Sequence, residues 1–322
     1  MARRRRGRPI NGVLILDKPA GHSSNRSLQI VKRLYDAQKA GHTGSLDPLA
    51  TGVLPVCFGE ATKFSQFLLD ADKAYISTFQ LGVTTASGDA DGEVLETRDA
   101  SAITQVEVAQ SLQQFAGEIE QVPSMFSALK HQGQPLYKLA RQGIEVERKV
   151  RRVTVYDIRL NDFRLAKDFR SQPEVDVYIH CSKGTYVRSI AEDLGKALGC
   201  GAHVTMLRRV AAGPYKESQL VSLQTLEALK ETQELQQLDA LLQPVDSALL
   251  HFPEVVLGEA ASHYMLQGHA VQAANTPTEG IVRMYVDNNA NEIESRSERQ
   301  FIGIGEVLED GRVGPKRLIA TN

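Results

Sequence analysis

The stretch GHTGSLDPLATG, residues 41–52, places one acid, Asp47, in a segment too rich in glycine and proline to form a long helix. An Asp followed by Pro is a familiar helix start, in which the acid caps the helix and Pro48 takes the first helical position. Here Gly52 and Pro55 would end such a helix after about one turn, which is too short to need a dedicated cap. Pro48 also biases Asp47 toward an extended backbone. The pattern therefore favours a carboxylate that is presented to a site.

The length and composition are those of an ordinary globular protein, with 322 residues, 42% of them hydrophobic and 24% charged. A chain of this length predicts a sizeable core divided between two domains. No apolar run is long enough for a membrane span, and the start of the chain lacks a clean signal segment. Cys57, Cys181 and Cys200 lack the paired spacing of a disulfide framework or a zinc site. These features predict a protein of the reducing cytoplasm.

Basic residues gather in two places, although the formal net charge of the chain is -2. The near-neutral total gives no argument for a nucleic-acid partner, whereas local clusters can do so. Each cluster is either a solvated surface or an RNA contact, and the pattern alone leaves both open. The clusters are Arg3, Arg4, Arg5, Arg6 and Arg8 near the start, and Arg148, Lys149, Arg151 and Arg152 further on.

Apolar periodicity predicts strands and helices that alternate without the regular rhythm of a doubly wound fold, which favours a mixed α+β fold. From about residue 250 the pattern changes to short β-like runs, among them 280–286 and 301–307. We therefore expect a basic tail at 1–9, a main domain at 10–250 and a small β-rich domain at 251–322. Strands are expected at 11–16, 53–59, 75–83 and 175–179, and helices from Ser23 or Ser24, at 61–69, near 108–115 and at 187–198.

Motifs for cofactors and metals are incomplete in this sequence. FIGIG, residues 301–305, lacks the third glycine of a dinucleotide motif, because Leu308 stands in its place. SGDADGE, residues 87–93, resembles part of a calcium loop, but Arg98 stands where the loop needs a glutamate, so an acidic turn is expected. The sequence has no Walker loop and no H-x-x-x-H pair. We expect neither a cofactor nor a metal.

Five segments together resemble the bacterial TruB family of tRNA pseudouridine synthases. Further on, FIGIGEVLEDGRVGPKRL (301–318) is similar to the small PUA domain that these enzymes carry at their C-terminal end. The segments follow the family order along the whole chain, which makes the resemblance far more specific than any single motif. They are INGVLILDKPAGHSSN (10–25), GHTGSLDPLATGVLP (41–55), DKAYISTFQLG (72–82), CSKGTYVRSIAEDLG (181–195) and GAHVTMLRR (201–209).

The resemblance implies a fold, a reaction and a partner. The implied fold is a pseudouridine synthase domain, with a mixed, mainly antiparallel central sheet flanked by helices, followed by a PUA domain. The implied reaction is the isomerisation of uridine 55 in the T-loop of tRNA to pseudouridine, after base flipping and without a cofactor. The implied partner is the T-arm of tRNA, and an enzyme that holds this region can also assist tRNA folding. No heptad seam suggests a dimer, so we expect a monomer.

The resemblance also implies three catalytic residues. Asp47 matches the nucleophile, and a carboxylate suits this role because its ordinary pKa of about 4 leaves it anionic at neutral pH. Arg188 matches its counter-charge, and Tyr75 matches a tyrosine that stacks on the uracil and is a candidate for handling the C5 proton. Without the resemblance, Arg188 would be a solvated helix residue and Tyr75 a half-buried strand residue. Whether Asp47 attacks C1′, attacks C6 or abstracts a 2′ proton stays open.

Five further positions match residues that surround the substrate in the family. His42 matches a histidine that helps to hold the everted base, and Tyr186 and Leu207 match pocket positions. Lys18 and Lys63 match lysines near the substrate, where phosphate contact is the functional interpretation. Without the resemblance, His42 and both lysines would be expected at the surface and Leu207 in the core.

Two other classes of function remain open. A non-catalytic RNA-binding or RNA-folding protein could use the same basic clusters and the same C-terminal domain. A phosphate-ester hydrolase could also use Asp47 as its nucleophile. Leu49 stands where such a hydrolase would carry its second acid, which makes the hydrolase a poor match.

Overall fold

The computed structural model describes residues 7–165, 172–287 and 299–320. The helices are α1 (Ser24–Leu34), α2 (Ser65–Asp70), α3 (Gln105–Gln113), α4 (Leu136–Ala140), α5 (Val187–Ala197), α6 (Leu223–Glu231), α7 (Leu235–Ala240) and α8 (Glu259–Leu266), with short 3-10 turns η1 (Gly59–Phe64), η2 (Glu217–Gln219) and η3 (Ser247–Leu249). The strands are β1 (Gly12–Lys18), β2 (Ala40–His42), β3 (Thr51–Phe58), β4 (Lys73–Leu81), β5 (Val83–Thr85), β6 (Val94–Thr97), β7 (Gly117–Gln121), β8 (Lys130–His131), β9 (Gln134–Pro135), β10 (Arg151–Arg164), β11 (Glu174–Cys181), β12 (Ala202–Ala212), β13 (Tyr215–Lys216), β14 (Val221–Ser222), β15 (Glu254–Leu257), β16 (Ile281–Asp287), β17 (Arg299–Val307) and β18 (Val313–Leu318).

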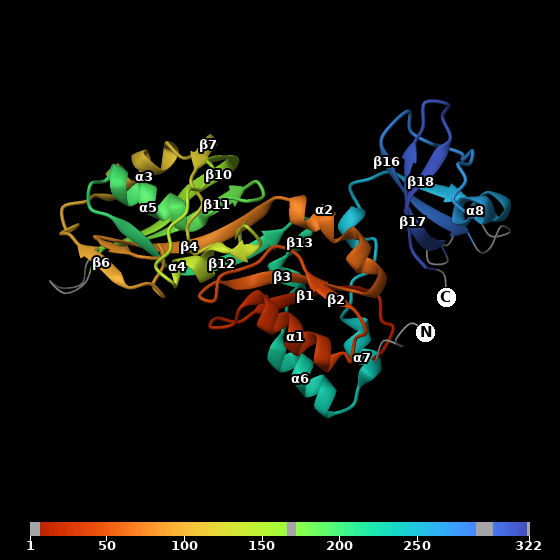
Figure 1. Cartoon of the computed structure of the whole chain (residues 1–322), viewed down its shortest axis with the longest axis horizontal. Helices are drawn as coiled ribbons and strands as arrows, with labels where there is room; N and C mark the ends of the chain where they lie inside the picture. Colours follow the sequence, from red (N-terminus) through yellow and green to blue (C-terminus); the bar gives the residue numbers. More distant parts are fainter. Residues whose placement is uncertain (1–6, 166–171, 288–298, 321–322) are drawn as a thin grey trace.

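A ten-stranded sheet runs through the main part of the molecule (Figure 1). Its order is β14-β1-β3-β12-β4-β11-β10-β7, with β2 paired to β3 and β13 paired to β12. The pairs β1–β14 and β3–β12 are parallel, and the others are antiparallel. This mixed, mainly antiparallel sheet with flanking helices confirms the predicted fold class. It also brings β3, β12 and β4 side by side in the middle of the sheet.

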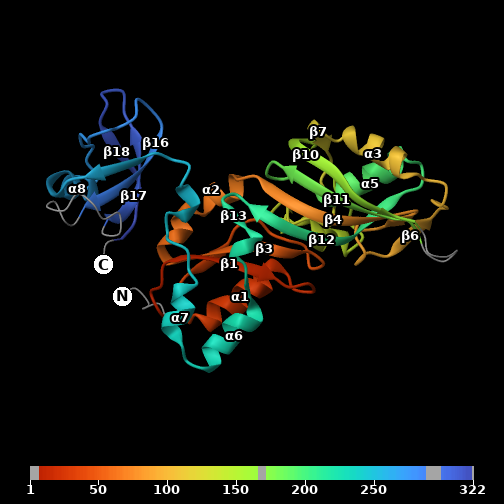
Figure 2. The same ribbon diagram turned by 180° about the vertical axis from the view of Figure 1, so that it is seen from behind.

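Alternation along the strands divides the core between the two faces of the sheet. Val175, Val177 and Ile179 of β11 are fully buried in a core that includes residues of α3 and α5, as predicted. Along β1, Val13 and Ile15 pack into a core with η1 and α2, whereas the leucines between and after them pack toward α1 and α6. Figure 2 shows α1 and α6 together at the β1 end of the sheet, with α3 and α5 at the other end.

A second sheet, in the order β15-β16-β17-β18, lies at one end of the molecule and is drawn in blue in Figure 1. It has a buried core of its own. It also packs on η1, where the Phe301 and Phe64 rings lie 5.6 Å apart between centroids. Lys63 Nζ donates to the Leu318 carbonyl at 2.9 Å, and Arg317 donates to the Lys63 carbonyl. The second sheet is therefore tied to the segment that leads into β4.

The predicted helix at 61–69 differs from the structure, where η1 is followed by the short helix α2. The Thr62 and Ser65 hydroxyls each donate to the carbonyl three residues earlier, at 2.7 and 3.0 Å. Such side-chain bonds to the backbone compete with the regular backbone bonds of a helix.

The helix predicted from Ser23 or Ser24 is α1. Ser23 is its N-cap, because its side chain accepts from the Arg26 N–H at 3.2 Å.

The structure describes the second basic cluster in full, but only Arg8 of the first. Arg8 forms an ion pair with Asp239, and Arg152 Nε lies 3.3 Å from Glu120 Oε1, with both side chains exposed. The tail residues Arg3, Arg4, Arg5 and Arg6 lie outside the described residues.

The predicted domain boundary at residue 250 falls between η3 and β15 and stays a prediction.

Candidate active site

The loop that carries Asp47 joins β2 to β3, and residues 48 and 49 form a bend rather than a helix. The Ser24 hydroxyl, at the start of α1, accepts from the Leu46 N–H at 2.8 Å and donates to the Leu46 carbonyl at 3.1 Å. The Gly21 N–H donates to the Pro48 carbonyl at 2.8 Å. The backbone is thus held on both sides of Asp47, and the carboxylate caps no helix.

Lys18, at the end of β1, lies beneath this loop and is 0% exposed. Its ammonium donates to the carbonyls of Pro19 at 2.8 Å, Pro48 at 3.3 Å and Ala50 at 2.6 Å. Burial lowers the pKa of Lys18 to about 8, and the negative charge of Asp47 opposes this change. The expectation that Lys18 is a surface residue is wrong. Two of the three carbonyls belong to the Asp47 loop, so Lys18 supports this loop, and its contact with the substrate stays a prediction.

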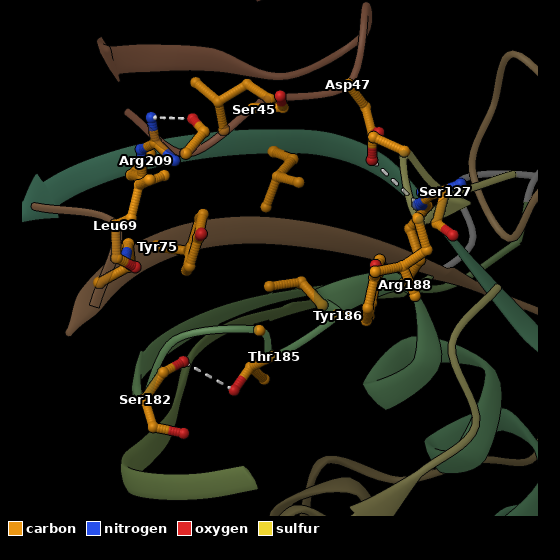
Figure 3. A pocket seen from close by; sticks show the side chains of 18 residues that line it. Ser45, Asp47, Leu69, Tyr75, Ser127, Ser182, Thr185, Tyr186, Arg188 and Arg209 are labelled. Atoms are coloured by element: carbon orange, nitrogen blue, oxygen red, sulfur yellow. Dashed lines mark hydrogen bonds and ion pairs between the residues drawn. The ribbon is translucent and has the colours of Figure 1, made fainter. Parts of the chain in front are cut away.

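Asp47 forms an ion pair with Arg188, the second residue of α5, with 3.0 Å between Oδ2 and Nε (Figure 3). The Arg188 side chain is 4% exposed, whereas that of Asp47 is 36% exposed and faces the open side. Arg188 Nη1 donates to the Ser87 carbonyl at 2.9 Å and lies 3.5 Å from Asp89 Oδ2. Nη2 donates to the Phe126 carbonyl at 3.0 Å. The two Nη atoms of the guanidinium are therefore held by backbone carbonyls, while its Nε forms the ion pair with Asp47.

The pKa of Asp47 is raised above its ordinary value, chiefly because burial disfavours the charged form. Arg188 opposes this shift most strongly, and Lys18 also opposes it. The neighbouring Asp89 acts with burial and raises the pKa. Arg188 thus favours the charged carboxylate in a place where burial favours the neutral acid.

A cleft of about 320 Å³ opens beside Asp47. Its walls come from the Asp47 loop, β4, β12, the turn before α5 and the segment 127–129 (Figure 3). Tyr75, Tyr186 and Leu207 line it together with Arg188. Aromatic and apolar walls with a few converging polar groups are what a site for a planar base needs.

Three predicted residues reach this cleft from three different elements. Tyr75 lies on β4, and Leu207 lies on β12, where it is 7% exposed and belongs to the main core as well. Tyr186 precedes α5, and its backbone is held by Gln121, whose side chain donates to the Tyr186 carbonyl at 3.1 Å and accepts from its N–H at 3.0 Å. All three join the predicted nucleophile and its arginine in one cleft.

His42 and Lys63 do not line this cleft. His42, on β2, is half-buried, and its Nδ1 has no hydrogen-bond partner among the described residues. Burial, together with the nearby cation of Arg209, lowers the pKa of His42 and favours the neutral ring. Lys63 lies 2.6 Å from Glu60 and bonds to β18, between the two sheets. The substrate contacts of both residues stay predictions.

Asp89 and Arg209 are among the charged residues at the site that sequence reasoning missed. Asp89 belongs to the segment interpreted as an acidic turn, yet it is 5% exposed and lies beside Arg188. Arg209 was noted only as part of a motif, yet it is 1% exposed and lines the cleft. A signal was present in the pair Arg208 and Arg209, because neighbouring strand residues face opposite sides and one of two adjacent arginines has to point inward.

Two further properties concern the described ranges as a whole. Within them, no group of three or more His, Cys, Asp or Glu side chains could hold a metal ion. No helix of these ranges has the length and apolar character needed to cross a membrane.

Comparison with known proteins decides the family. The chain is 52% identical to the tRNA pseudouridine synthase B of Vibrio atlanticus over 325 aligned residues, which cover 99% of this chain and 97% of that protein. The chain belongs to the TruB family of tRNA pseudouridine synthases. The TruB-family enzyme of the same name from Coxiella burnetii is 51% identical, covering 97% of this chain and 96% of that protein.

Three TruB family models match consecutive parts of the chain. The model described as TruB family pseudouridylate synthase (N terminal domain) matches residues 32–187. The tRNA pseudouridylate synthase B C-terminal domain matches 188–250, and the model of pseudouridine synthase II TruB, C-terminal, matches 253–319. These matches confirm the predicted family, and the last one fits the predicted PUA-like domain. TruB membership supports tRNA pseudouridine synthesis, an isomerase reaction.

Solved structures share the fold of this TruB-family chain. A chain of a Cbf5-Nop10-Gar1 complex superposes with a TM-score of 0.67 at 25% identity, covering 95% of this chain and 84% of that one. A chain of an H/ACA RNP bound to a substrate RNA containing 2′-deoxyuridine gives a TM-score of 0.68 at 23% identity, covering 100% and 92%. Both likenesses confirm the pseudouridine synthase fold.

Proposed function

We propose that this chain converts uridine 55 in the T-loop of tRNA to pseudouridine, with Asp47 as the nucleophile. The observation that carries the proposal is the ion pair of Asp47 and Arg188 on the wall of a cleft that Tyr75 and Leu207 also line. The cleft has the size of a site for one nucleoside rather than for a folded RNA loop. The target uridine therefore has to leave its stack to meet the carboxylate.

The chemistry is an isomerisation in which the N1–C1′ bond breaks and the C5–C1′ bond forms. C5 loses a proton and N1 gains one, so atoms and electrons balance without a co-reactant. Asp47, kept anionic by Arg188, supplies a nucleophile that needs no partner base. Tyr75 lies where it can stack on the uracil and take part in the transfer of the C5 proton, and Leu207 gives the cleft an apolar wall that limits water.

The remaining predicted residues take supporting roles in this proposal. Tyr186 completes the wall of the cleft, and His42, as a neutral ring, helps to hold the everted nucleotide. Lys63 contacts a phosphate near the second sheet, whereas Lys18 acts from beneath the loop. A monomer binds the T-arm of tRNA, and this binding also assists folding of the tRNA.

Asp47→Asn tests the proposal because it preserves the shape of the side chain and removes its charge. We expect the variant to bind unmodified tRNA as the wild type does but to form pseudouridine at position 55 more slowly by at least about 1,000-fold. Conversion is measured without added cofactor, by reverse-transcription stops specific for pseudouridine. Asp193→Asn, on the exposed side of α5, is the matched control and should convert like the wild type.

Each alternative function gives a different result in the same assay. Conversion by Asp47→Asn at the wild-type rate would contradict the role of the carboxylate. A wild-type protein that binds tRNA without converting it would favour the RNA-binding or RNA-folding function. Release of inorganic phosphate from a test ester, dependent on added magnesium, would favour the hydrolase.

A further inference from the structure

Two neighbouring arginines of β12 meet opposite environments. Arg208 is 32% exposed and pairs with Asp17 at 3.0 Å and with Glu217 at 2.6 Å. Arg209 faces the other side of the sheet, is 1% exposed and forms no ion pair with a carboxylate in the described part of the chain. A buried cation without a counter-ion is strongly disfavoured unless its surroundings compensate for it. The role of Arg209 can therefore be inferred from the polar groups that surround its guanidinium.

The Arg209 guanidinium bonds to both ends of the loop that carries Asp47. Its Nε donates to the Val53 carbonyl, in β3, at 2.6 Å. Its Nη2 donates to the Gly44 carbonyl at 3.0 Å (Figure 3). In the parallel pairing of β3 and β12, the residue opposite Arg209 is Gly52. A Cβ at Gly52 would lie 2.2 Å from the Arg209 carbonyl. β3 and β12 thus approach each other as closely as a glycine permits, and one side chain bonds to the chain on both sides of the Asp47 loop.

The same guanidinium faces Tyr75 on β4, which is the other strand next to β12. The antiparallel register of β12 and β4 sets Arg209 directly opposite Tyr75, and both residues line the cleft. Burial raises the pKa of Tyr75, and the Arg209 cation opposes that rise. A positive charge at this position favours negative charge on the phenol oxygen.

We propose that Arg209 is a positioning residue that couples the Asp47 loop to Tyr75 and stabilises negative charge on the phenol oxygen during proton transfer. In that step the phenol releases its proton to solvent and its oxygen takes the C5 proton, the electron pair of the C5–H bond restores the ring double bond, and N1 takes a proton from solvent. The proton first released by the phenol to solvent balances the one that N1 takes up. This inference rests on the proposed roles of Asp47 and Tyr75.

The variants Arg209→Gln and Arg209→Lys separate the two contributions. The glutamine keeps N–H donors without the charge, and the lysine keeps the charge without the planar fork that reaches two carbonyls. We expect the single-turnover rate of pseudouridine formation to fall about 100-fold in Arg209→Gln and about tenfold in Arg209→Lys. We expect the Kd for unmodified tRNA, measured separately, to be unchanged in both.

Arg208→Gln is the matched control, since it removes a neighbouring arginine from the opposite face and should leave the rate unchanged. A double variant tests the path through the phenol. If Arg209 acts through Tyr75, Arg209→Gln should slow a Tyr75→Phe protein much less than it slows the wild type.

Three results would overturn the proposal: equal losses in Arg208→Gln and Arg209→Gln, a loss confined to Kd, or fully additive effects of Arg209→Gln and Tyr75→Phe. If Arg209→Gln does not fold, Arg209→Lys decides alone, because a wild-type rate in that variant is also contrary to the proposal. Failure of the proposed function gives different results. Either the wild type does not convert uridine 55, or Asp47→Asn converts it at the wild-type rate.

Discussion

At Asp47, burial and neighbouring charge act in opposite directions. Burial and the nearby acids Asp89 and Asp91 raise the pKa of this carboxyl, while Arg188 and Lys18 lower it. A carboxyl whose pKa is higher in the folded than in the unfolded protein reduces the free energy of unfolding once it ionises, because the folded state binds the proton more tightly. A reactive residue that lowers stability in this way is common in active sites.

We therefore expect Asp47→Asn to be at least as stable as the wild type at neutral pH. The destabilisation by the carboxylate is absent below its unfolded pKa of about 3.9, grows as the pH rises through the folded pKa and is constant above it. The difference in Tm between variant and wild type should accordingly shrink as the pH is lowered to about 4. Thermal melts across this range measure it, with Asp193→Asn as the control. A variant that melts well below the wild type at neutral pH would show that the ion pair with Arg188 outweighs burial.

Between β3 and β12, the close backbone approach at Gly52 sets the geometry of the loop. Gly52 has a φ of +95°, and an added Cβ would lie 2.2 Å from the Arg209 carbonyl. We expect Gly52→Ala to lower the free energy of unfolding by more than about 3 kcal/mol, because backbone has to move in the middle of the sheet.

Gly117→Ala is the matched control for this prediction. Gly117 has a φ of +88° and nothing within 4 Å of the added Cβ, so only the backbone strain remains. That strain is about 1–2 kcal/mol. Denaturant titration measures the free energy of unfolding of both variants. Equal losses of that free energy would show that β12 can move away from the added Cβ without destabilising the protein.

Elements with one buried face could be predicted from the sequence. The alternation of Val175, Val177 and Ile179 marked β11, and the helical period after Ser23 marked α1. The break between η1 and α2 could not be predicted from apolar spacing, because it depends on hydroxyls of Thr62 and Ser65 that bond to the backbone.

The charged residues of the site show where sequence patterns stop being informative. The resemblance placed Asp47, Arg188 and Tyr75 together, and the structure brings these three to one cleft. Lys18 and Arg209 depend on carbonyls far away in the chain, at 30 and 32 residues for Lys18 and at 156 and 165 residues for Arg209. Local periodicity carries no information about such partners. The adjacent pair Arg208 and Arg209 indicates that one arginine points inward, but not which carbonyls it meets.

Over the whole molecule, the two sheets are joined by a shared core. We propose domains at 10–250 and 251–322, with the second one docked on η1 and α2. Its own core is separate, but Phe301 and Ile304 of β17 complete a core with Phe64 and Leu68. Such an apolar contact favours cooperative unfolding of both parts.

We expect the wild type to unfold in a single thermal transition. Phe301→Ala should lower the stability by about 3 kcal/mol and separate an early transition that belongs to the second sheet. Leu250→Ala is the control, because Leu250 is 60% exposed between the two sheets. Differential scanning calorimetry distinguishes the outcomes, and two transitions in the wild type would contradict the shared core.

The opposite surroundings of Arg208 and Arg209 also restrict how the chain can misfold. A slip of β12 by one residue would exchange the two faces of the strand. A slip in one direction would bring Leu207 to Asp17 and Glu217, which would lose their cation. A slip in the other direction would bring Val210 to the Gly44 and Val53 carbonyls, which would lose their donor. Either slip leaves polar groups without partners, so this pair of arginines fixes the alignment of the central strands.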